Sequence, residues 1–256
     1  MAEIERIPTG IHGLDELIEG GIPAGSSLLV AGGPGTGKTI AVTQMAYNFL
    51  KQGKIVVLMS LESDTEKIYG RGDMFGWNLR DYAEKRQLMV ATPREEIVDI
   101  NNTAEDIISM GKMKHDKGVV IILDSITKFL EIGVRKEKSQ EKKAGQEVEV
   151  VKSMRDLHRQ DIWRLMLKLE KAFKGTNTTL ILVGEAEDGG PRITVDGVAE
   201  YECDGVMILR KNVVGDAVNR FIEVAKLRET KIESGMVPFE FTKNGIKVGQ
   251  SENTNS

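Results

Sequence analysis

The sequence contains a single cysteine, Cys203, among its 256 residues, so no disulfide bond can form within one chain. Such scarcity is typical of proteins in a reducing compartment, and we expect a cytoplasmic location. Nowhere does an apolar run approach the roughly 20 residues that a transmembrane helix needs. The first residues, MAEIERIPTGIHGL, also lack the apolar centre of a secretion signal, so we expect no membrane contact.

Aromatic residues make up only 5% of the chain, and basic residues do not outnumber acidic ones. Lys and Arg number 35 against 39 Asp and Glu, which gives a net charge of −4. A protein that mainly coats nucleic acid needs an excess of cationic surface and, for single strands, aromatic rings for stacking. That function is therefore disfavoured, although a local basic patch stays open.

Continuous apolar runs alternate with amphipathic stretches through most of the chain. They predict strands at 27–31, 54–62, 87–93, 118–125 and 178–185, and helices at 39–52, 65–76, 103–118 and 161–175, with Thr103 as a helix N-cap. This alternation indicates an α/β fold with a mostly parallel central sheet. Runs at 204–211, 219–228 and 237–248 then follow one another closely, with Asn244-Gly245 as a hairpin signal, and predict an antiparallel C-terminal extension.

We expect one domain over residues 1–248, followed by a polar, disordered tail at 249–256. Residues 131–160 carry a dense mixture of both charges and are predicted to form an insertion in this domain. A solvated helix or a mobile loop is the simplest interpretation of such a run. A surface loop that contacts a partner or lines a pore is the alternative.

The stretch GGPGTGKT at 32–39 fits the pattern G-x-x-x-x-G-K-[ST] completely. It follows a buried strand and opens a helix, which is the context that this phosphate-binding loop (P-loop) requires. Its backbone N–H groups can cradle phosphates, Lys38 can reach the β- and γ-phosphates, and the Thr39 hydroxyl can bind Mg²⁺. The residues expected to hold ATP are Gly33, Pro34, Gly35, Thr36, Gly37, Lys38, Thr39 and Ile40.

Three carboxylates stand at the ends of predicted strands: Glu62, Asp124 and Glu185. The carboxyl ends of parallel strands meet at one edge of a sheet, so all three are expected beside the P-loop. Asp124 is the candidate that holds Mg²⁺ through water, Glu62 is the candidate base for hydrolysis, and Glu185 is a candidate sensor of the γ-phosphate. An ordinary strand end, a helix cap or a surface charge is the alternative for each.

Together these residues resemble the KaiC-like branch of the RecA superfamily of ATPases, over nearly the whole chain apart from 131–160 and the tail. The segment TGIHGLDELIEGGIPAGSSLLVAGGPGTGKT is similar to the family's opening, MFGWNL to its FGW turn, and IILDS to the strand with its metal-binding carboxylate. GVAEYECDGVMILR and KLRETKIESGMVPFEFTKNGI are similar to its C-terminal strands. The last match discriminates best, because P-loops occur in many folds.

The resemblance implies a RecA-like P-loop fold and a homo-oligomer, a hexameric ring, with ATP and Mg²⁺ between subunits. In such rings a Lys-Leu-Arg strand of one subunit meets the γ-phosphate bound by its neighbour, and here those residues are Lys226, Leu227 and Arg228, with Thr230 beside them. Alternation along a strand places Lys226 and Arg228 on one face. A cation at the γ-phosphate stabilises charge in the transition state, worth about 10³–10⁵ in rate for an arginine finger. A pair of solvated cations is the alternative.

The sequence also departs from the family pattern. Ser63 replaces the second of two Glu residues that often end the second strand, so we expect slow turnover. Three further departures affect positions near the expected nucleotide and leave its sugar and base contacts open: Glu229, Ile232 and Lys243.

A different departure concerns kinase activity. Circadian KaiC phosphorylates a Ser-Thr pair, and this chain has Glu200 and Tyr201 on the predicted strand at the corresponding position. We therefore expect no circadian-type autokinase activity there. The sequence contains one P-loop, which indicates one KaiC-like domain and not the tandem form.

Three functions remain open. An ATPase module with a regulatory or signalling role is favoured, with a protein partner contacting 131–160. A DNA-binding recombinase or helicase-type paralogue is the second, and the locally basic RKEKSQEKK segment supports it, while the interleaved acids oppose it. A nucleotide-dependent scaffold with little turnover is the third.

Overall fold

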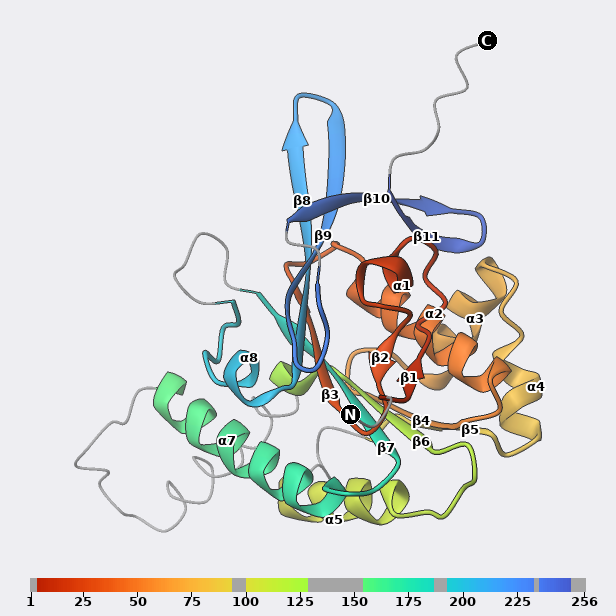
Figure 1. The fold of residues 1–256 in the computed structure, drawn as a ribbon, viewed down its shortest axis with the longest axis vertical. Coiled ribbons are helices and arrows are strands. Elements are labelled where there is room, and N and C mark those ends of the chain that lie inside the picture. Colours follow the sequence, from red (N-terminus) through yellow and green to blue (C-terminus); the bar gives the residue numbers. More distant parts are fainter. Residues whose placement is uncertain (1–3, 94–99, 129–153, 187–192, 233–234, 250–256) are drawn as a thin grey trace.

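The computed structural model describes residues 4–93, 100–128, 154–186, 193–232 and 235–249 (Figure 1). A nine-stranded mixed sheet runs through its centre, in the order β11-β10-β9-β8-β3-β7-β6-β4-β5. Its parallel strands are β3 (Ser27–Gly32), β4 (Ile55–Ser60), β5 (Leu88–Ala91), β6 (Val119–Asp124), β7 (Thr178–Glu185) and β8 (Gly205–Val214). The antiparallel extension consists of β9 (Ala217–Leu227), β10 (Met236–Thr242) and β11 (Gly245–Val248). The predicted α/β fold is therefore confirmed.

Side-chain alternation along the parallel strands divides the core into two layers. On β3, Leu28 and Val30 pack into one cluster and Leu29 and Ala31 into the other. The first layer is covered by α1 (Leu14–Leu17), α2 (Lys38–Lys51), α3 (Thr65–Met74) and α4 (Leu79–Glu84). The second is covered by α5 (Ile100–Gly111), α7 (Met154–Phe173) and α8 (Ala199–Glu202). Because both faces are covered, the strands read as continuous apolar runs in the sequence.

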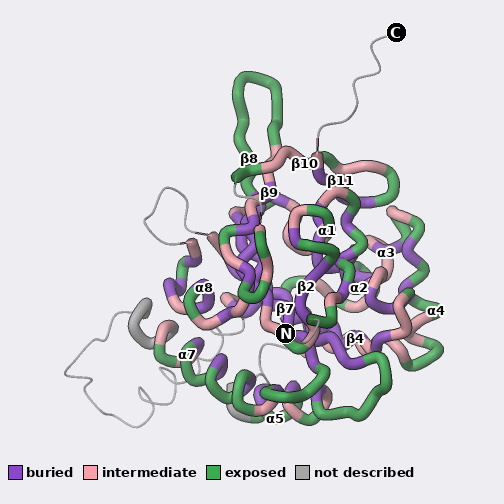
Figure 2. Tube along the Cα trace, viewed as in Figure 1, coloured by how far each residue is buried: buried purple, intermediate pink, exposed green. Residues whose placement is uncertain are grey.

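Away from this core, the distal part of the β8–β9 hairpin projects as a two-stranded ribbon (Figures 1 and 2). Residues 210–219 are exposed, and Figure 2 shows this ribbon in green above the buried sheet. A separate two-stranded sheet of β1 (Arg6–Ile7) and β2 (Ile22–Pro23) lies near the N-terminus. None of the helices in the described part of the chain combines the length and the apolar character that crossing a bilayer would require.

Several local predictions were wrong. Thr103 is not an N-cap, because α5 has already begun at Ile100, and the helical spacing of Ile100, Ala104 and Ile107 agrees with the earlier start. The helix predicted at 161–175 is longer, since α7 begins at Met154. Glu200 and Tyr201 lie in the short helix α8 and not on a strand. The short helix α4 was not predicted at all.

Two of the predicted segments lie wholly or largely outside the described residues. The charged insertion at 131–160 is described only from Met154, where it forms the start of α7. The tail at 249–256 is described only at Gly249. The hairpin signal near Asn244 is confirmed, because Thr242 pairs with Gly245 across the turn between β10 and β11.

Gln44 ties this C-terminal hairpin to the helix that follows the P-loop. Its side chain is buried on α2, where its Oε1 accepts the Ile246 N–H at 2.6 Å and its Nε2 donates to the Ile246 carbonyl at 3.2 Å. One amide therefore satisfies both backbone groups of a buried residue on β11. Burial without such partners would cost free energy at both groups.

We expect Gln44→Ala to lower the free energy of unfolding by about 1–3 kcal/mol, because the Ile246 N–H and carbonyl would lose their partner. Urea unfolding measures this change. Gln52→Ala is the matched control: Gln52 follows the same helix and makes one exposed bond, to the Pro8 carbonyl. Equal losses in the two variants would contradict the assigned role of Gln44.

Candidate nucleotide-binding site

Four parallel strands end at the same edge of the sheet. Gly32 at the end of β3 pairs with Glu185 at the end of β7, and Asp124 at the end of β6 pairs with Ser60 at the end of β4. The β6–β7 register completes the row, since Asp124 lies opposite Val183. The P-loop therefore begins beside the strand ends that carry the three predicted carboxylates.

The P-loop is closely packed from both sides. A Cβ on Gly32 would lie 2.6 Å from the Leu209 carbonyl oxygen, and a Cβ on Gly37 would lie 2.6 Å from the Phe241 ring. Gly37 also has a φ of 107° where it caps α2, a conformation that side chains other than glycine rarely adopt. Thr36 is buried, and its hydroxyl donates to the Gly33 carbonyl at 2.9 Å. These constraints set the loop's shape in advance of any ligand.

Lys38 is the first residue of α2 and folds back over the loop. Its Nζ donates to the carbonyls of Gly32 at 2.8 Å and Gly33 at 3.1 Å. The amine of Lys38 thus lies against the backbone of the P-loop, next to the N-terminus of a 14-residue helix. A helix N-terminus and an adjacent amine together favour an anion.

Asp124 is the buried carboxylate of the site, with 3% of its surface exposed. Burial, and secondly the charge of Glu62, raises its pKa to about 6, while the Thr39 hydroxyl, Arg71 and Lys38 act in the opposite direction. Its Oδ1 is buried and has no hydrogen-bond partner in the described part of the chain. A desolvated carboxylate with an unused oxygen beside a threonine hydroxyl is the donor set that a hard divalent cation prefers. The residues present therefore fit Mg²⁺.

Glu62 follows β4 and is held from the neighbouring strand. Ser125, next to Asp124, donates its hydroxyl to Glu62 Oε1 at 2.7 Å. The buried Ser60 hydroxyl accepts the backbone N–H groups of Glu62 at 3.3 Å and Ser63 at 3.1 Å, so it fixes the turn after β4. The Glu62 residue itself is exposed, which leaves a carboxylate oriented by Ser125 yet open to water.

Glu185 ends β7 between the P-loop strand and β6. Its backbone N–H donates to the Thr127 hydroxyl at 3.2 Å, and its carbonyl accepts from Val195 at 3.0 Å. This places Glu185 at the predicted edge. Its side chain is half-buried.

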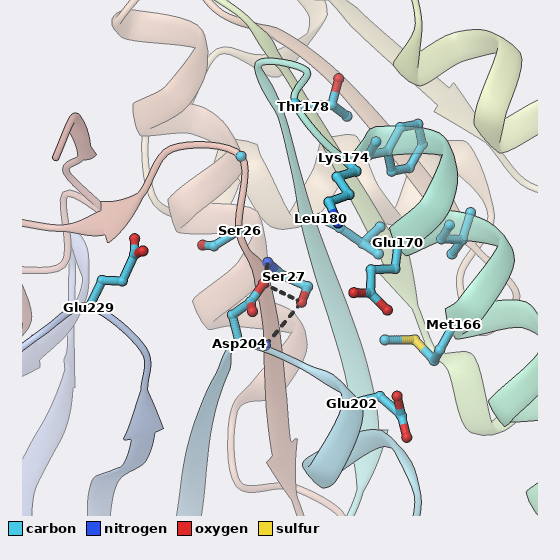
Figure 3. A pocket seen from close by; sticks show the side chains of 14 residues that line it. Ser26, Ser27, Met166, Glu170, Lys174, Thr178, Leu180, Glu202, Asp204 and Glu229 are labelled. Carbon is cyan, nitrogen blue, oxygen red and sulfur yellow. Dashed lines mark hydrogen bonds between the residues drawn. The ribbon is translucent and has the colours of Figure 1, made fainter. Parts of the chain in front are cut away.

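Lys226 and Arg228 lie at the opposite end of the parallel strands, beside the start of β8. Arg228 Nη1 forms an ion pair with Asp204 Oδ1 at 3.0 Å, and Asp204 Oδ2 accepts from both the N–H and the hydroxyl of Ser27 at 2.9 Å (Figure 3). Ser27 starts β3, whereas the P-loop leaves its end at Gly32. At about 3.3 Å per residue the two ends are roughly 17 Å apart. The two cations therefore cannot serve the P-loop of their own chain.

Both cations face the junction between α8 and β8, which agrees with their predicted common side. Lys226 Nζ donates to the carbonyls of Cys203 at 2.6 Å and Tyr201 at 3.1 Å. Burial, and then the charge of Arg228, lowers the pKa of Lys226. The Arg228 side chain is 58% exposed, so its guanidinium remains accessible in spite of its ion pair.

The residues around this pair have structural contacts of their own. Leu227 is buried and pairs with Gly205, while the Thr230 hydroxyl accepts from Arg6 Nη1 at 2.8 Å. Glu229 has a φ of 58° and lines a cavity of about 430 Å³. Figure 3 shows that Asp204, Glu202 and Glu170 also border this cavity. The departure at Glu229 therefore adds a carboxylate to an acidic surface beside Arg228.

The sequence did not identify three residues that shape the site: Arg71, Ser125 and Phe241. Ser125 follows Asp124 directly and could have been found as a polar residue after a strand end. Arg71 and Phe241 come from a helix and a hairpin remote in sequence from the P-loop, so no local pattern marks them.

A family model described as the KaiC ATPase matches residues 7–253. The chain belongs to the KaiC family of ATPases. It is 30% identical to the UPF0273 protein PH0284 of Pyrococcus horikoshii over 250 residues, which cover 95% of this chain and 93% of that protein. It is 28% identical to the circadian clock oscillator protein KaiC of Parathermosynechococcus lividus over 258 residues, 97% of this chain and 43% of that protein. The chain thus spans less than half the length of the clock protein.

A solved structure shows the same fold. The crystal structure of the KaiC-like protein PH0186 from Pyrococcus horikoshii OT3 matches with a TM-score of 0.77 at 26% identity, over 97% of this chain and all of that one. The RecA-like, KaiC-like resemblance drawn from the sequence is therefore confirmed. This KaiC-family chain carries a nucleotide-binding, ATPase-type module.

We expect Lys38→Ala to weaken ATP binding at least about tenfold, because charged hydrogen bonds to the phosphates would be lost. Titration with a fluorescent ATP analogue measures the affinity, and circular dichroism checks the fold. Lys51→Ala is the control, since Lys51 is an exposed lysine in the last turn of the same helix. If Lys38→Ala bound ATP as tightly as the natural chain, the assigned site would be wrong.

Proposed function

We propose that this chain is a slow, Mg²⁺-dependent ATPase that acts as a homo-oligomeric ring, a hexamer, with a regulatory or signalling role. The observation that carries the proposal is the placement of two half-sites at opposite ends of β3. Lys38 and Asp124 lie at one end, and Lys226 and Arg228 lie at the other. A second copy that packs head to tail supplies the missing half to each P-loop, in a heterologous interface that can close into a ring.

ATP binds through Gly33, Pro34, Gly35, Thr36, Gly37, Lys38, Thr39 and Ile40 in this proposal. Thr39 and Asp124 hold the metal ion, which neutralises phosphate charge when bound. The neighbouring subunit contributes Lys226, Leu227, Arg228 and Thr230. The support for this arrangement is the exposed guanidinium of Arg228 together with the preformed P-loop.

Hydrolysis proceeds by attack of water on the γ-phosphorus. The bond between the γ-phosphorus and the oxygen bridging to the β-phosphorus breaks, ADP leaves, and Glu62 accepts a proton from the water. Ser125 orients the carboxylate of Glu62 through its hydrogen bond. Arg228 stabilises charge on the transferred group, and Glu185 senses the γ-phosphate from the end of β7.

Other parts of the proposal follow from the sequence. Residues 1–248 act as one domain, a protein partner contacts the charged segment at 131–160, and the protein works in the cytoplasm. Glu200 and Tyr201 do not support circadian-type autophosphorylation. Nucleic acid is not proposed as a ligand, because the chain has a net charge of −4 and few aromatic residues.

Glu62→Gln is expected to keep ATP binding and to reduce ATP hydrolysis about 10²–10⁴-fold, since the proton acceptor is lost. Phosphate release and nucleotide titration measure the two quantities. Glu66→Gln, an exposed carboxylate on α3, serves as the control. Tight ATP binding without turnover in the natural chain would favour the scaffold function, and unchanged hydrolysis in Glu62→Gln would remove Glu62 as the base.

Arg228→Ala is expected to reduce hydrolysis by about 10³-fold or more if its guanidinium reaches a neighbour's γ-phosphate. The control is Arg80→Ala, because Arg80 also forms an exposed ion pair, with Glu66 at 2.7 Å. An equal and small effect in both variants would show that Arg228 is a surface cation only.

Mixing inactive subunits tests whether Arg228 acts on a neighbour. When Lys38→Ala and Arg228→Ala subunits are combined in equal amounts, about a quarter of the interfaces in a random ring join an intact P-loop to an intact Arg228. We expect hydrolysis to recover accordingly in the mixture. No recovery, with exchange of subunits shown by mass measurement, would rule out a shared site.

A further inference from the structure

The guanidinium of Arg71 lies near the end of β4, beside the residue that follows the candidate base Glu62, although no local pattern marked Arg71. It belongs to α3, and its side chain reaches back to the turn after β4, where Nη2 lies 3.4 Å from the Ser63 hydroxyl. Its other terminal nitrogen, Nη1, is buried and finds no hydrogen-bond partner among the residues that the structure describes. A buried N–H without a partner is costly, so this nitrogen calls for an explanation.

A second unpaired group faces the same region. Within the described ranges Asp124 Oδ1 is also buried without a partner, and the charge of Arg71 lowers the pKa of this carboxyl. Both the donor atom and the acceptor atom are buried, and neither has a hydrogen-bond partner among the described residues. An anion would accept from the guanidinium, and a cation would satisfy the carboxylate oxygen.

The backbone that carries Arg71 is fixed. Ile68 and Gly72, on either side of it in α3, are buried. A Cβ on Gly72 would lie 2.8 Å from the Trp77 carbonyl oxygen and 2.9 Å from the Leu79 side chain, so the helix is packed against the following turn. Ser63 offers Arg71 only a neutral hydroxyl, which leaves the charge of the guanidinium uncompensated by that contact.

We infer that Arg71 donates a hydrogen bond to the terminal phosphate of ATP from within the same chain. This inference rests on the proposed function, and it adds a cation in cis to the cation that Arg228 supplies in trans. The terminal phosphate is the anion that belongs between Lys38 and Glu62, and Thr39 and Asp124 would hold the metal ion, which would supply further positive charge beside it. A planar guanidinium suits such contact because it presents several N–H groups in fixed directions.

The test compares Arg71→Ala and Arg71→Lys with the control Arg80→Ala. Arg80 lies close by but is exposed, paired with Glu66 and stacked on the Tyr69 ring at 4.6 Å. The first readout is the ratio of ATP to ADP affinity, measured by titration with fluorescent analogues in the presence of Mg²⁺. The second is hydrolysis under saturating ATP, and the third is thermal unfolding without nucleotide.

We expect Arg71→Ala to reduce the preference for ATP over ADP about tenfold and hydrolysis about 10²-fold, with Arg71→Lys between it and the natural chain. Arg80→Ala should change neither ratio nor rate. Added guanidinium at millimolar concentration should partly restore hydrolysis in Arg71→Ala. Loss of thermal stability without a change in the ATP to ADP ratio in either Arg71 variant would make Arg71 structural and overturn the inference.

The outcomes also separate this inference from the function on which it rests. If the natural chain binds and hydrolyses ATP and Arg71→Ala does so equally well, the inference fails and the proposed function stands. If the natural chain binds ATP without turnover, the affinity ratio still decides the contact. If it binds neither ATP nor ADP, the proposed function fails and the contact fails with it.

Discussion

The parallel pairing of β3 with β7, of β7 with β6 and of β6 with β4 is the constraint on which the rest of the structure depends. It aligns Gly32, Ser60, Asp124 and Glu185 at one edge, so residues more than 150 positions apart in the sequence meet around one loop. Parallel strands need covered faces, and the helices on both sides provide them. A shift in register would separate the P-loop from its carboxylates without changing any residue.

A second set of contacts governs the other edge. Asp204 binds the start of β3 with one oxygen and Arg228 with the other. The same aspartate therefore links the strand that carries the P-loop to the cation expected to serve another P-loop. Lys226 adds bonds to the carbonyls of Tyr201 and Cys203, which fix the end of α8.

The sequence was most informative where a single local pattern suffices. The apolar runs predict the parallel sheet because both faces of each strand are buried, and the P-loop motif specifies Lys38 and Thr39 by their spacing. Strand ends located Asp124 and Glu62. Arg71, Gln44 and Phe241 were out of reach, because each acts through a contact between elements far apart along the chain. The prediction that Thr103 is a helix N-cap was wrong, because α5 begins about one turn earlier, at Ile100.

Because the P-loop and Arg228 lie at opposite ends of β3, the two surfaces through which subunits would join are different. In an open row of subunits joined through these edges, one end keeps a P-loop without its cations and the other keeps cations without a P-loop. Each such row has one complete site fewer than it has subunits, and the deficit weighs most on the shortest assemblies. Only closure removes both unpaired ends, so in the proposed ring the placement of these residues at opposite ends of β3 would make the number of complete sites depend on protein concentration.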